Sequence, residues 1–525
     1  MASPVQTPVV RADSEGFIEF LRTNRKGWTS LVALALGWWA FWTWTLRYHQ
    51  LDDAFITLRY AQHLVQSGEL AFNPHLPSRG NSSLLYTYVV ALVYSLYPSP
   101  LDTKFLSVMF DAILSAAIFF RFFRAKSDAA AALWLALLVV ILSPMGFRWL
   151  TDGMETSFHC LLAYAIACSA SATTTYERPW PRFALLTILG LAAVLLRVEA
   201  SLLVASASIG LLVRSISSEK RGARAPIINK VLSASHLSVG AMVGLAIVIL
   251  KYGAILPDTA AAKSVKSSAF TLGHLIYFAH AVGGSFTLGI GLIVLAAGSA
   301  ALAYVAQNST GEKLAILAGN LPFPTLWLVA WSRGQEAQIR YFLASLIFAI
   351  VWNLTSLDKA TSLDRVSPRQ ADRVQRWVAP AIAGFLMLAI LAYVPETARV
   401  YHIGETRAHS FLAMRSEHLE ALASSTGVAA EIGMIGFFSQ AQICDIGGLV
   451  GGRDWAAMRF VDRIKACAER SPAFVFANAP QIDDLRKYLD IDAMKPCFNY
   501  PLPNVSTEDV HTLYVDRKFF GILCK

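Results

Sequence analysis

Charged residues are scarce in this 525-residue chain, where Asp, Glu, Lys and Arg together make up 15%. Soluble globular proteins carry roughly 25%. Apolar residues make up 55% of the sequence, and several apolar runs approach the ~20 residues needed to span a bilayer. The low charge argues against an ordinary soluble enzyme and predicts a polytopic α-helical membrane protein.

The sequence also lacks the familiar motifs of several enzyme classes. No Gly-rich phosphate loop of the Walker or Rossmann type occurs, and no His/Cys spacing fits a zinc site. No internal repeat is visible, so the two-repeat symmetry of many secondary transporters is missing. The formal charge of +9 does not predict a nucleic-acid partner, because the Lys and Arg residues cluster in short loops between apolar runs.

The charges of the loops order the apolar runs into a topology. Basic clusters at residues 22–26, 121–126, 178–182, 214–230 and 365–376 fall on one side, which the positive-inside rule makes the cytoplasm. Residues 1–26 are then a cytoplasmic tail and residues 27–396 a membrane domain. About 11 crossings are expected, near residues 27–47, 103–120, 128–149, 157–171, 183–196, 200–213, 231–250, 283–305, 313–331, 341–356 and 377–396.

The apolar segment Leu84–Tyr97 cannot be a crossing without inverting every later loop. It is also too short to span, which favours a re-entrant or interfacial segment. Residues 48–102 therefore form one extracytoplasmic loop. Within it Asp53–Ser67 has helical character, with one apolar stripe and polar residues off that stripe. The stripe is Ile56, Tyr60 and Leu64, and the polar residues are Arg59, Gln62, His63 and Gln66.

Residues 397–525 differ in composition from the preceding chain, because charged residues, turn signals and strand-like runs such as Ala473–Ala477 appear. We expect an extracytoplasmic α/β domain here. Four of the six cysteines lie in this segment and predict one or two disulfides with open connectivity. They are Cys444, Cys467, Cys497 and Cys524.

Two adjacent carboxylates, Asp52 and Asp53, follow the first predicted crossing. Near the bilayer centre each would cost roughly 2.5–3.5 kcal/mol, so they must lie in water or in a polar cavity. They are candidates for chemistry, and the alternative is that one of them only caps the following helix.

The topology brings further polar residues from separate loops to the same face. A constellation of this kind could bind an anionic headgroup and perform acid–base chemistry on it. Structural alternatives remain: an ion pair for Arg197 and Glu199, and a solvated side chain for Lys263. A third alternative is interfacial anchoring for Arg148, Arg333 and Arg340. The full set is Asp52, Asp53, Arg59, Asn73, Arg79, Asn81, Arg148, Asp152, Glu155, Arg197, Glu199, Asp258, Lys263, Lys266, Arg333, Glu336, Arg340 and Tyr341.

The block from Asp52 to Pro74, followed by Arg79-Gly-Asn-Ser-Ser-Leu-Leu-Tyr86, resembles the first extracytoplasmic loop of GT-C integral-membrane glycosyltransferases. The likeness is to the arabinofuranosyltransferase branch and covers roughly residues 30–400. Later landmarks match in order, and Val428–Gly448 resembles this branch's periplasmic domain. The landmarks are Asp152-Gly-Met-Glu-Thr156, Arg197-Val-Glu199, Leu256-Pro-Asp-Thr259 with Ala262-Lys-Ser264, and Arg340-Tyr341. Asn81-Ser82 and Val198 depart from the family pattern.

The resemblance implies an inverting enzyme of the bacterial inner membrane that serves the cell envelope. It would move a sugar, at family level arabinofuranose, from a polyprenyl-phosphate donor to a hydroxyl of a glycan, lipopolysaccharide or pilin. Asp52 or Asp53 would be the base, with Asp52 slightly preferred. The candidate ligands of the donor phosphate are Arg59, Lys263, Arg340 and Tyr341.

A divalent cation, Mg²⁺ or Mn²⁺, could bridge Asp53 with Asp152 or Glu155, although nothing in the sequence demands it. The rival interpretation is a lipid-linked sugar transporter or flippase. That class predicts charges near the bilayer midplane, whereas here they gather at one face with Asp111 as the main exception. A binding module carried by the C-terminal domain is a third possibility, which leaves the acidic pair unexplained.

Overall fold

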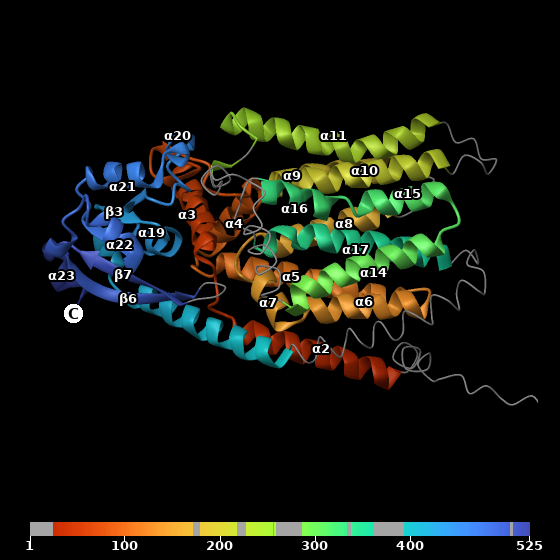
Figure 1. Ribbon diagram of the computed structural model, residues 1–525, viewed down its shortest axis with the longest axis horizontal. Helices are drawn as coiled ribbons and strands as arrows, with labels where there is room; N and C mark the ends of the chain where they lie inside the picture. The colour runs from red at the N-terminus through yellow and green to blue at the C-terminus, as the bar shows by residue number, and fades with distance from the viewer. Residues whose placement is uncertain are drawn as a thin grey trace, which may run out of the picture.

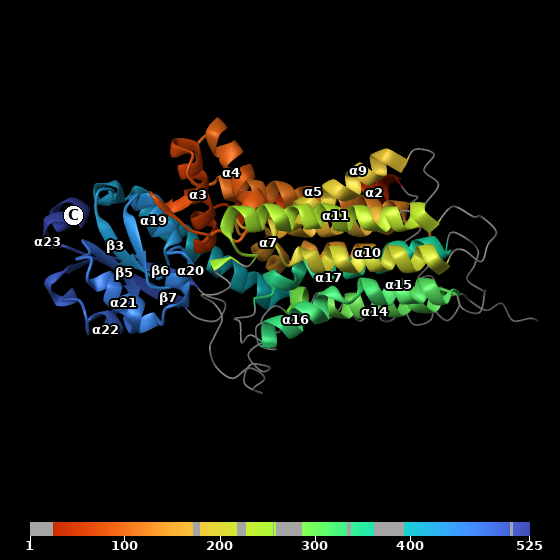
Figure 2. The ribbon, with the colours of Figure 1, turned by 90° about the horizontal axis from the view of Figure 1, so that it is seen from above.

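The computed structural model describes residues 25–171, 179–217, 227–255, 257–258, 286–332, 338–361, 393–503 and 508–524. Figures 1 and 2 show an elongated molecule, with a bundle of long helices and a sheet-containing unit at one end of it. Helices α3 (Asp52–Ser67) and α4 (Leu84–Leu96) lie at the junction between these two parts. The predicted helix Asp53–Ser67 is thus confirmed, one residue longer.

The bundle contains the apolar runs of the sequence. Five described helical segments are long and apolar enough to cross a membrane, or six if one bent pair counts as a span. The number of 11 crossings stays a prediction, and most of 377–396 lies outside the described residues. The bundle helices are α2 (Arg25–Thr45), α5 (Asp102–Arg124), α6 (Asp128–Ile141), α7 (Pro144–Leu150), α8 (Thr156–Ser171), α9 (Pro179–Leu196), α10 (Ala200–Ser217), α11 (Ile227–Tyr252), α14 (Gly291–Ala306) after a π-helical turn Phe286–Ile290, α15 (Thr310–Gly319), α16 (Pro322–Ser332) and α17 (Arg340–Thr361).

The crossing predicted at 128–149 is two helices, α6 and α7, bent by 68°. Pro144 opens α7 without an amide hydrogen to donate, and the Ser143 side chain accepts a hydrogen bond from the Gly146 amide. Proline at the first helical position and serine as N-cap are typical of a helix start. The bend therefore follows from a local signal inside a continuous apolar run.

The outer surface of the bundle is apolar, as expected for helices in contact with lipid. On α2 and α11 several large apolar side chains are exposed, for example Trp44 at 69% and Leu250 at 86%. Inside the bundle, α9 and α11 approach closely at Gly190 and Gly240, where a Cβ atom would overlap the backbone of the other helix. Small residues at such contacts are characteristic of helix packing in membranes.

The sheet-containing unit follows a helix at residues 393–416 and a short 3₁₀ turn at Leu419–Leu422. Its five strands lie in the order β4-β3-β5-β7-β6, with β3 parallel to β4 and β5, and β7 antiparallel to β5 and β6. The elements are β3 (Thr426–Ala429), α19 (Gly433–Ser439), β4 (Gln442–Asp445), α20 (Arg453–Ala457), α21 (Phe460–Ala468), β5 (Phe474–Asn478), α22 (Ala479–Leu485), a 3₁₀ turn Ile491–Ala493, β6 (Lys495–Pro503), β7 (Glu508–Val515) and α23 (Arg517–Leu523).

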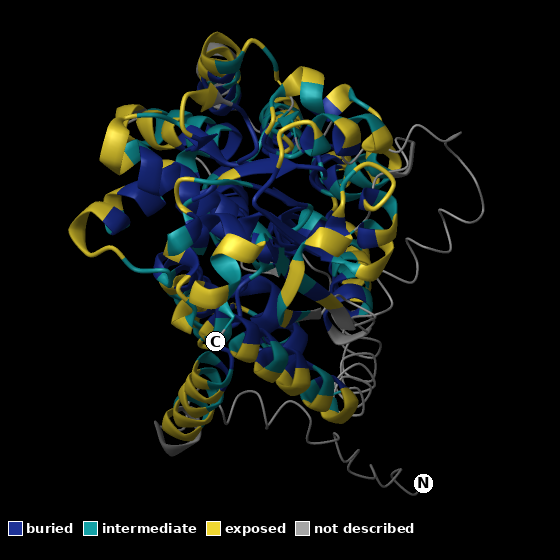
Figure 3. Ribbon diagram, turned by 90° about the vertical axis from the view of Figure 1, so that its left-hand side faces the viewer, coloured by how far each residue is buried: buried dark blue, intermediate teal, exposed yellow. Residues whose placement is uncertain are grey.

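Two disulfides close this unit, which answers the connectivity that the sequence leaves open. Cys444 on β4 is bonded to Cys467 on α21, and Cys497 on β6 is bonded to Cys524 after α23. Viewed from this end, buried residues occupy the centre of the molecule and exposed ones the rim (Figure 3).

Helix α3 is buried on nearly all sides. The sequence predicts polar residues off its apolar stripe, yet Arg59, Gln62 and His63 are buried along with Ile56 and Tyr60. Helix α4 packs against one side and α19 of the sheet-containing unit against another. The apolar stripe alone could not reveal this second neighbour, which comes from the far end of the chain. The loop is completed by the hairpin β1 (Ala71–Asn73) and β2 (Leu76–Pro77).

Candidate active site

An ion pair between the first loop and the bundle marks the centre of the site. Arg340, the first residue of α17, donates from Nη2 to Oδ2 of Asp53 on α3 at 2.8 Å. The Arg340 side chain is 6% exposed and that of Asp53 is 27% exposed. Within the described part of the chain, Nε and Nη1 of Arg340 have no hydrogen-bond partner. Buried donors are nearly always satisfied in proteins, so this guanidinium is suited to a further anionic acceptor.

A second arginine lies beside the first. Arg197, between α9 and α10, donates to Oε1 of Glu155 at 2.6 Å and to Oε1 of Glu199 at 3.0 Å. The guanidinium carbon lies 5.6 Å from the ring centre of Tyr341, and that of Arg340 lies 5.3 Å from the same ring. One tyrosine thus contacts two guanidinium groups, which brings landmarks from three separate loops into one site.

Ser82 also reaches this network, since its hydroxyl donates to Oε1 of Glu155 at 2.9 Å. The sequence singles out Ser82 only as a departure from the family pattern. The adjacent Asn81 is turned away, and its Nδ2 donates to Oγ1 of Thr87 at 2.9 Å.

Asp152 is fully buried and lies close enough to Arg340 and Glu155 to interact with their charges. Oδ1 accepts a hydrogen bond from the amide of Met154 at 2.9 Å, and Oδ2 has no partner among the described residues. Burial raises the pKa of Asp152 to about 7, although the charge of Arg340 opposes this shift. Its carboxyl group therefore changes protonation near neutral pH.

Arg79 and Asp258 form the edge of the site. The Arg79 amide donates to Oδ2 of Asp258 at 2.9 Å, and its Nη1 donates to the carbonyls of Ala254 and Ile255 at 2.9 and 2.7 Å. The guanidinium also lies over the ring of Tyr252, 4.8 Å from its centre. These contacts fasten the chain after α11 to the first loop. Lys263, Lys266, Arg333 and Glu336 lie outside the described residues.

Arg148 is 2% exposed, which excludes its interpretation as an anchor that reaches toward headgroups. It lies over the Trp149 ring, and its Nε and Nη1 have no partner in the described part of the molecule. Nearby, Nζ of Lys104 donates to the carbonyl and the hydroxyl of Thr151. The sequence analysis missed Lys104, although a lysine inside a predicted crossing is itself a signal.

Asp52, Arg59 and Asn73 do not join this network. Both carboxylate oxygens of Asp52 accept backbone hydrogen bonds, from Gly433 and Met434 at 2.7 Å each. All three guanidinium nitrogens of Arg59 donate to carbonyls, and the side chain is fully buried. Arg59 therefore cannot bind donor phosphate as expected, because it is enclosed by protein. The geometry also reverses the slight preference for Asp52 over Asp53.

Two of the three carboxylates expected to hold a divalent cation, Asp53 and Glu155, are paired with arginines, and among the described residues Asp152 is not. Asp53 faces Arg340 and Glu155 faces Arg197, so guanidinium groups occupy the positions next to both. Across the described ranges, no three His, Cys, Asp or Glu residues gather as metal ligands. The bridging cation therefore stays a prediction.

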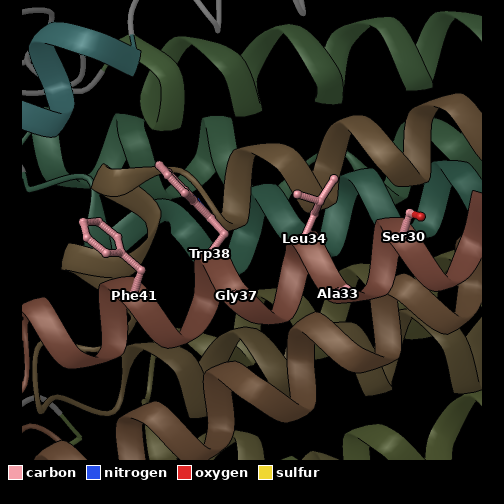
Figure 4. Close-up of a pocket in the computed structure, with 6 residues that line it drawn as sticks. All are labelled: Ser30, Ala33, Leu34, Gly37, Trp38 and Phe41. Carbon is pink, nitrogen blue, oxygen red and sulfur yellow. The ribbon is translucent and has the colours of Figure 1, made fainter.

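A hollow along α2 is lined mainly by apolar residues (Figure 4). Its lining residues are Ser30, Ala33, Leu34, Gly37, Trp38 and Phe41. None of these side chains titrates, so among the described residues this hollow offers no acid–base chemistry.

No protein-family model and no curated protein matches the sequence. Two solved structures of ArnT from Cupriavidus metallidurans are similar in fold. The form bound to undecaprenyl phosphate has 14% sequence identity and a TM-score of 0.53, and the apo form has 13% and 0.56. Each alignment covers 93% of this chain and 98% of ArnT. The chain therefore has an ArnT-like fold over nearly its whole length.

Proposed function

We propose that this protein is a glycosyltransferase that takes a sugar from a polyprenyl phosphate and passes it to an acceptor hydroxyl. The observation that carries the proposal is the Asp53–Arg340 pair at the start of α17, with two further buried donors of Arg340 beside it. A carboxylate next to unsatisfied guanidinium donors suits a reaction in which a hydroxyl loses a proton while a phosphate leaves. The ArnT structure bound to undecaprenyl phosphate supports a polyprenyl-phosphate ligand.

In the proposed reaction the acceptor oxygen attacks the anomeric carbon of the donor sugar. Its proton passes to the carboxylate of Asp53. The bond between the anomeric carbon and the phosphate oxygen breaks, and polyprenyl phosphate leaves with the electron pair. A single displacement inverts the anomeric centre. Arg340, with Tyr341 and Arg197 beside it, stabilises the charge that grows on the phosphate.

Donor binding also prepares the base in this scheme. In the structure Arg340 is paired with Asp53, and a paired carboxylate is a weak base because the ion pair favours its charged form. A donor phosphate competes for the same guanidinium with an arrangement of oxygens that it binds bidentately. Transfer of Arg340 to the phosphate leaves Asp53 more basic once the substrate is in place.

The finer assignments follow the family resemblance. Arabinofuranose is the proposed sugar, and a glycan, lipopolysaccharide or pilin of the cell envelope is the proposed acceptor. The site would face the periplasm across the inner membrane, with the N-terminus in the cytoplasm and residues 397–525 outside. The two disulfides support this orientation, because such bonds persist in oxidising compartments.

The test is sugar transfer in membranes from radiolabelled polyprenyl-phospho-arabinofuranose, comparing wild type with Asp53→Asn at matched expression. Removing a positioned base lowers kcat by about 10²- to 10⁴-fold. Asp516→Asn is the control, since Asp516 caps α23 in the sheet-containing unit. Full transfer by Asp53→Asn would remove Asp53 as base. A wild type inert with several lipid-linked sugars would favour the transporter.

A further inference from the structure

We propose that the sheet-containing unit is a positioning element of the active site and that Asp52 is the positioning residue through which it acts on Asp53. This inference rests on the proposed function. It concerns the α3 joint, defined as the contacts of Asp52, Arg59 and Asn73 with residues 433–443.

The α3 joint has three polar attachments along one side of α3 and the hairpin after it. The Asp52 carboxylate accepts hydrogen bonds from the backbone amides of Gly433 and Met434, at the start of α19. Arg59 donates to the carbonyls of Gly436 and Ala441 as well as to that of Phe72. Asn73 exchanges two hydrogen bonds with the backbone of Ile443, at 2.8 and 2.9 Å. Each attachment therefore joins a side chain of the first loop to backbone of the sheet-containing unit.

The joint is also closely packed. A Cβ atom at position 433 would overlap the backbone oxygen of Asp52, and one at 436 would crowd Arg59 and Phe72. Phe55 contacts Phe437 and Phe438 from α19, with ring centres 5.8 Å apart in both pairs. Buried polar groups that are fully satisfied and closely packed hold one geometry, because any displacement leaves donors or acceptors unpaired.

Asp53 is adjacent to Asp52 on the first turn of α3, so the joint fixes the turn that carries the candidate base. Consecutive residues on a helix point about 100° apart, which lets Asp52 face α19 while Asp53 faces Arg340. The turn is held from its other side too, since the amide of Leu51 donates to the carbonyl of Asp152 at 3.0 Å. Small displacements of a reacting group lower the reaction rate by large factors. Loosening α19 should therefore misplace Asp53.

Gly433→Ala in the full-length protein tests this inference without altering any titratable group. The added methyl group pushes α19 away from Asp52, and we expect kcat with polyprenyl-phospho-arabinofuranose to fall about 10- to 100-fold. KM for the donor should change by less than about 2-fold, because Arg340 still binds phosphate. Asn73→Ala should lower kcat in the same direction. The fold-decrease in kcat of the double variant should be smaller than the product of the two single fold-decreases, because both changes loosen one joint.

Gly521→Ala is the matched control, since Gly521 lies in α23 and a Cβ there meets nothing within 4 Å. It should keep kcat within about 2-fold of wild type. A Gly433→Ala protein that keeps more than half of the wild-type kcat overturns the proposal. So does an Asp52→Asn variant as inactive as Asp53→Asn while Asn73→Ala is fully active, because Asp52 would then be the base.

Hydrogen exchange of residues 52–67 separates this inference from the proposed function. Gly433→Ala and Asn73→Ala should both speed exchange in α3, whether or not the protein transfers sugar. Faster exchange in both variants than in wild type, combined with a wild type that is inert with the donor, would overturn the function and leave the joint standing. Unchanged exchange in both variants would overturn the joint. If Gly433→Ala does not fold, Asn73→Ala decides alone by the same two measurements.

Discussion

Asp52 and Asp53 are neighbours in sequence and in the first turn of one helix, yet their surroundings differ in kind. Asp52 is 5% exposed and accepts hydrogen bonds from two backbone amides. Asp53 is partly exposed and forms an ion pair with a guanidinium group from another helix. The same contrast separates Arg59, which is enclosed by carbonyls, from Arg340, whose Nε and Nη1 have no partner among the described residues. Two adjacent carboxylates that form one motif in the sequence thus have different partners, backbone amides for Asp52 and a side chain for Asp53.

The difference follows from the kind of partner. Backbone amides and carbonyls are fixed in place by secondary structure, so a side chain bonded to them is held in one position. An ion pair between two side chains can exchange one partner for an incoming ion of the same charge. The two residues proposed for catalysis, Asp53 and Arg340, are accordingly partners of each other's side chains.

Replacing each arginine by lysine gives the strongest test of this contrast. Arg340→Lys keeps the charge but loses the planar fork, and we expect kcat to fall about 100-fold or more. Arg59→Lys should lower kcat only about 10-fold through the joint, but it should lower the unfolding temperature more. Transfer assays and thermal unfolding in detergent measure both. If the two variants showed the same loss of kcat and the same loss of unfolding temperature, the distinction between Arg59 and Arg340 would be refuted.

The two carboxylates that share Arg197 should differ in their effect on stability. Glu155 is 1% exposed in its pair and Glu199 is 45% exposed. Removing one partner of a buried pair costs about 3–5 kcal/mol, whereas an exposed pair contributes about 0–1 kcal/mol. Glu155→Ala should therefore lower the free energy of unfolding far more than Glu199→Ala in denaturant titrations. Equal losses would mean that Arg197 is not held by Glu155.

The smallest expected effect concerns Asp52, which should make the stability of the fold depend on pH. Burial raises the pKa of Asp52 to about 6 from an ordinary value of 3.8, despite the backbone amides, so folding favours the protonated form. This contribution is complete below about pH 4 and is lost as pH rises through about 6. The wild type should unfold at a higher temperature at pH 5 than at pH 7.5, and Asp52→Asn should reduce that difference. An unchanged slope in Asp52→Asn would show that other groups cause it.

Helix α3 and β5 could be predicted from sequence because their signals are local. A period of four in the apolar residues marks α3, and a run of strand formers marks β5 at Phe474–Asn478. The gathering of Glu155, Arg197, Arg340 and Tyr341 was also predictable, because the predicted topology places all four at the same ends of the expected crossings. In contrast, the roles of Asp52 and Arg59 depend on residues 433–441. Neither periodicity nor loop charge carries information about a partner so distant in sequence.

The bend after α6 is indicated by two residues in the sequence, but a hydropathy profile does not detect them. Ser143-Pro144 is a typical helix start, but it lies within an apolar run long enough for one crossing. Length and hydropathy favour a single helix, and only the missing amide of proline favours two.

The sequence distance across the α3 joint has a consequence for how the protein is made. Asp52 and its amide partners are separated by 381 and 382 residues. A ribosome completes the first loop long before it reaches α19, so a carboxylate and a guanidinium that end up buried wait without their partners during most of synthesis. The first loop of the nascent chain therefore stays incomplete until nearly all of the chain has been translated. Truncation before residue 433 would leave the first loop without its support, even where every apolar helix before that point had been inserted.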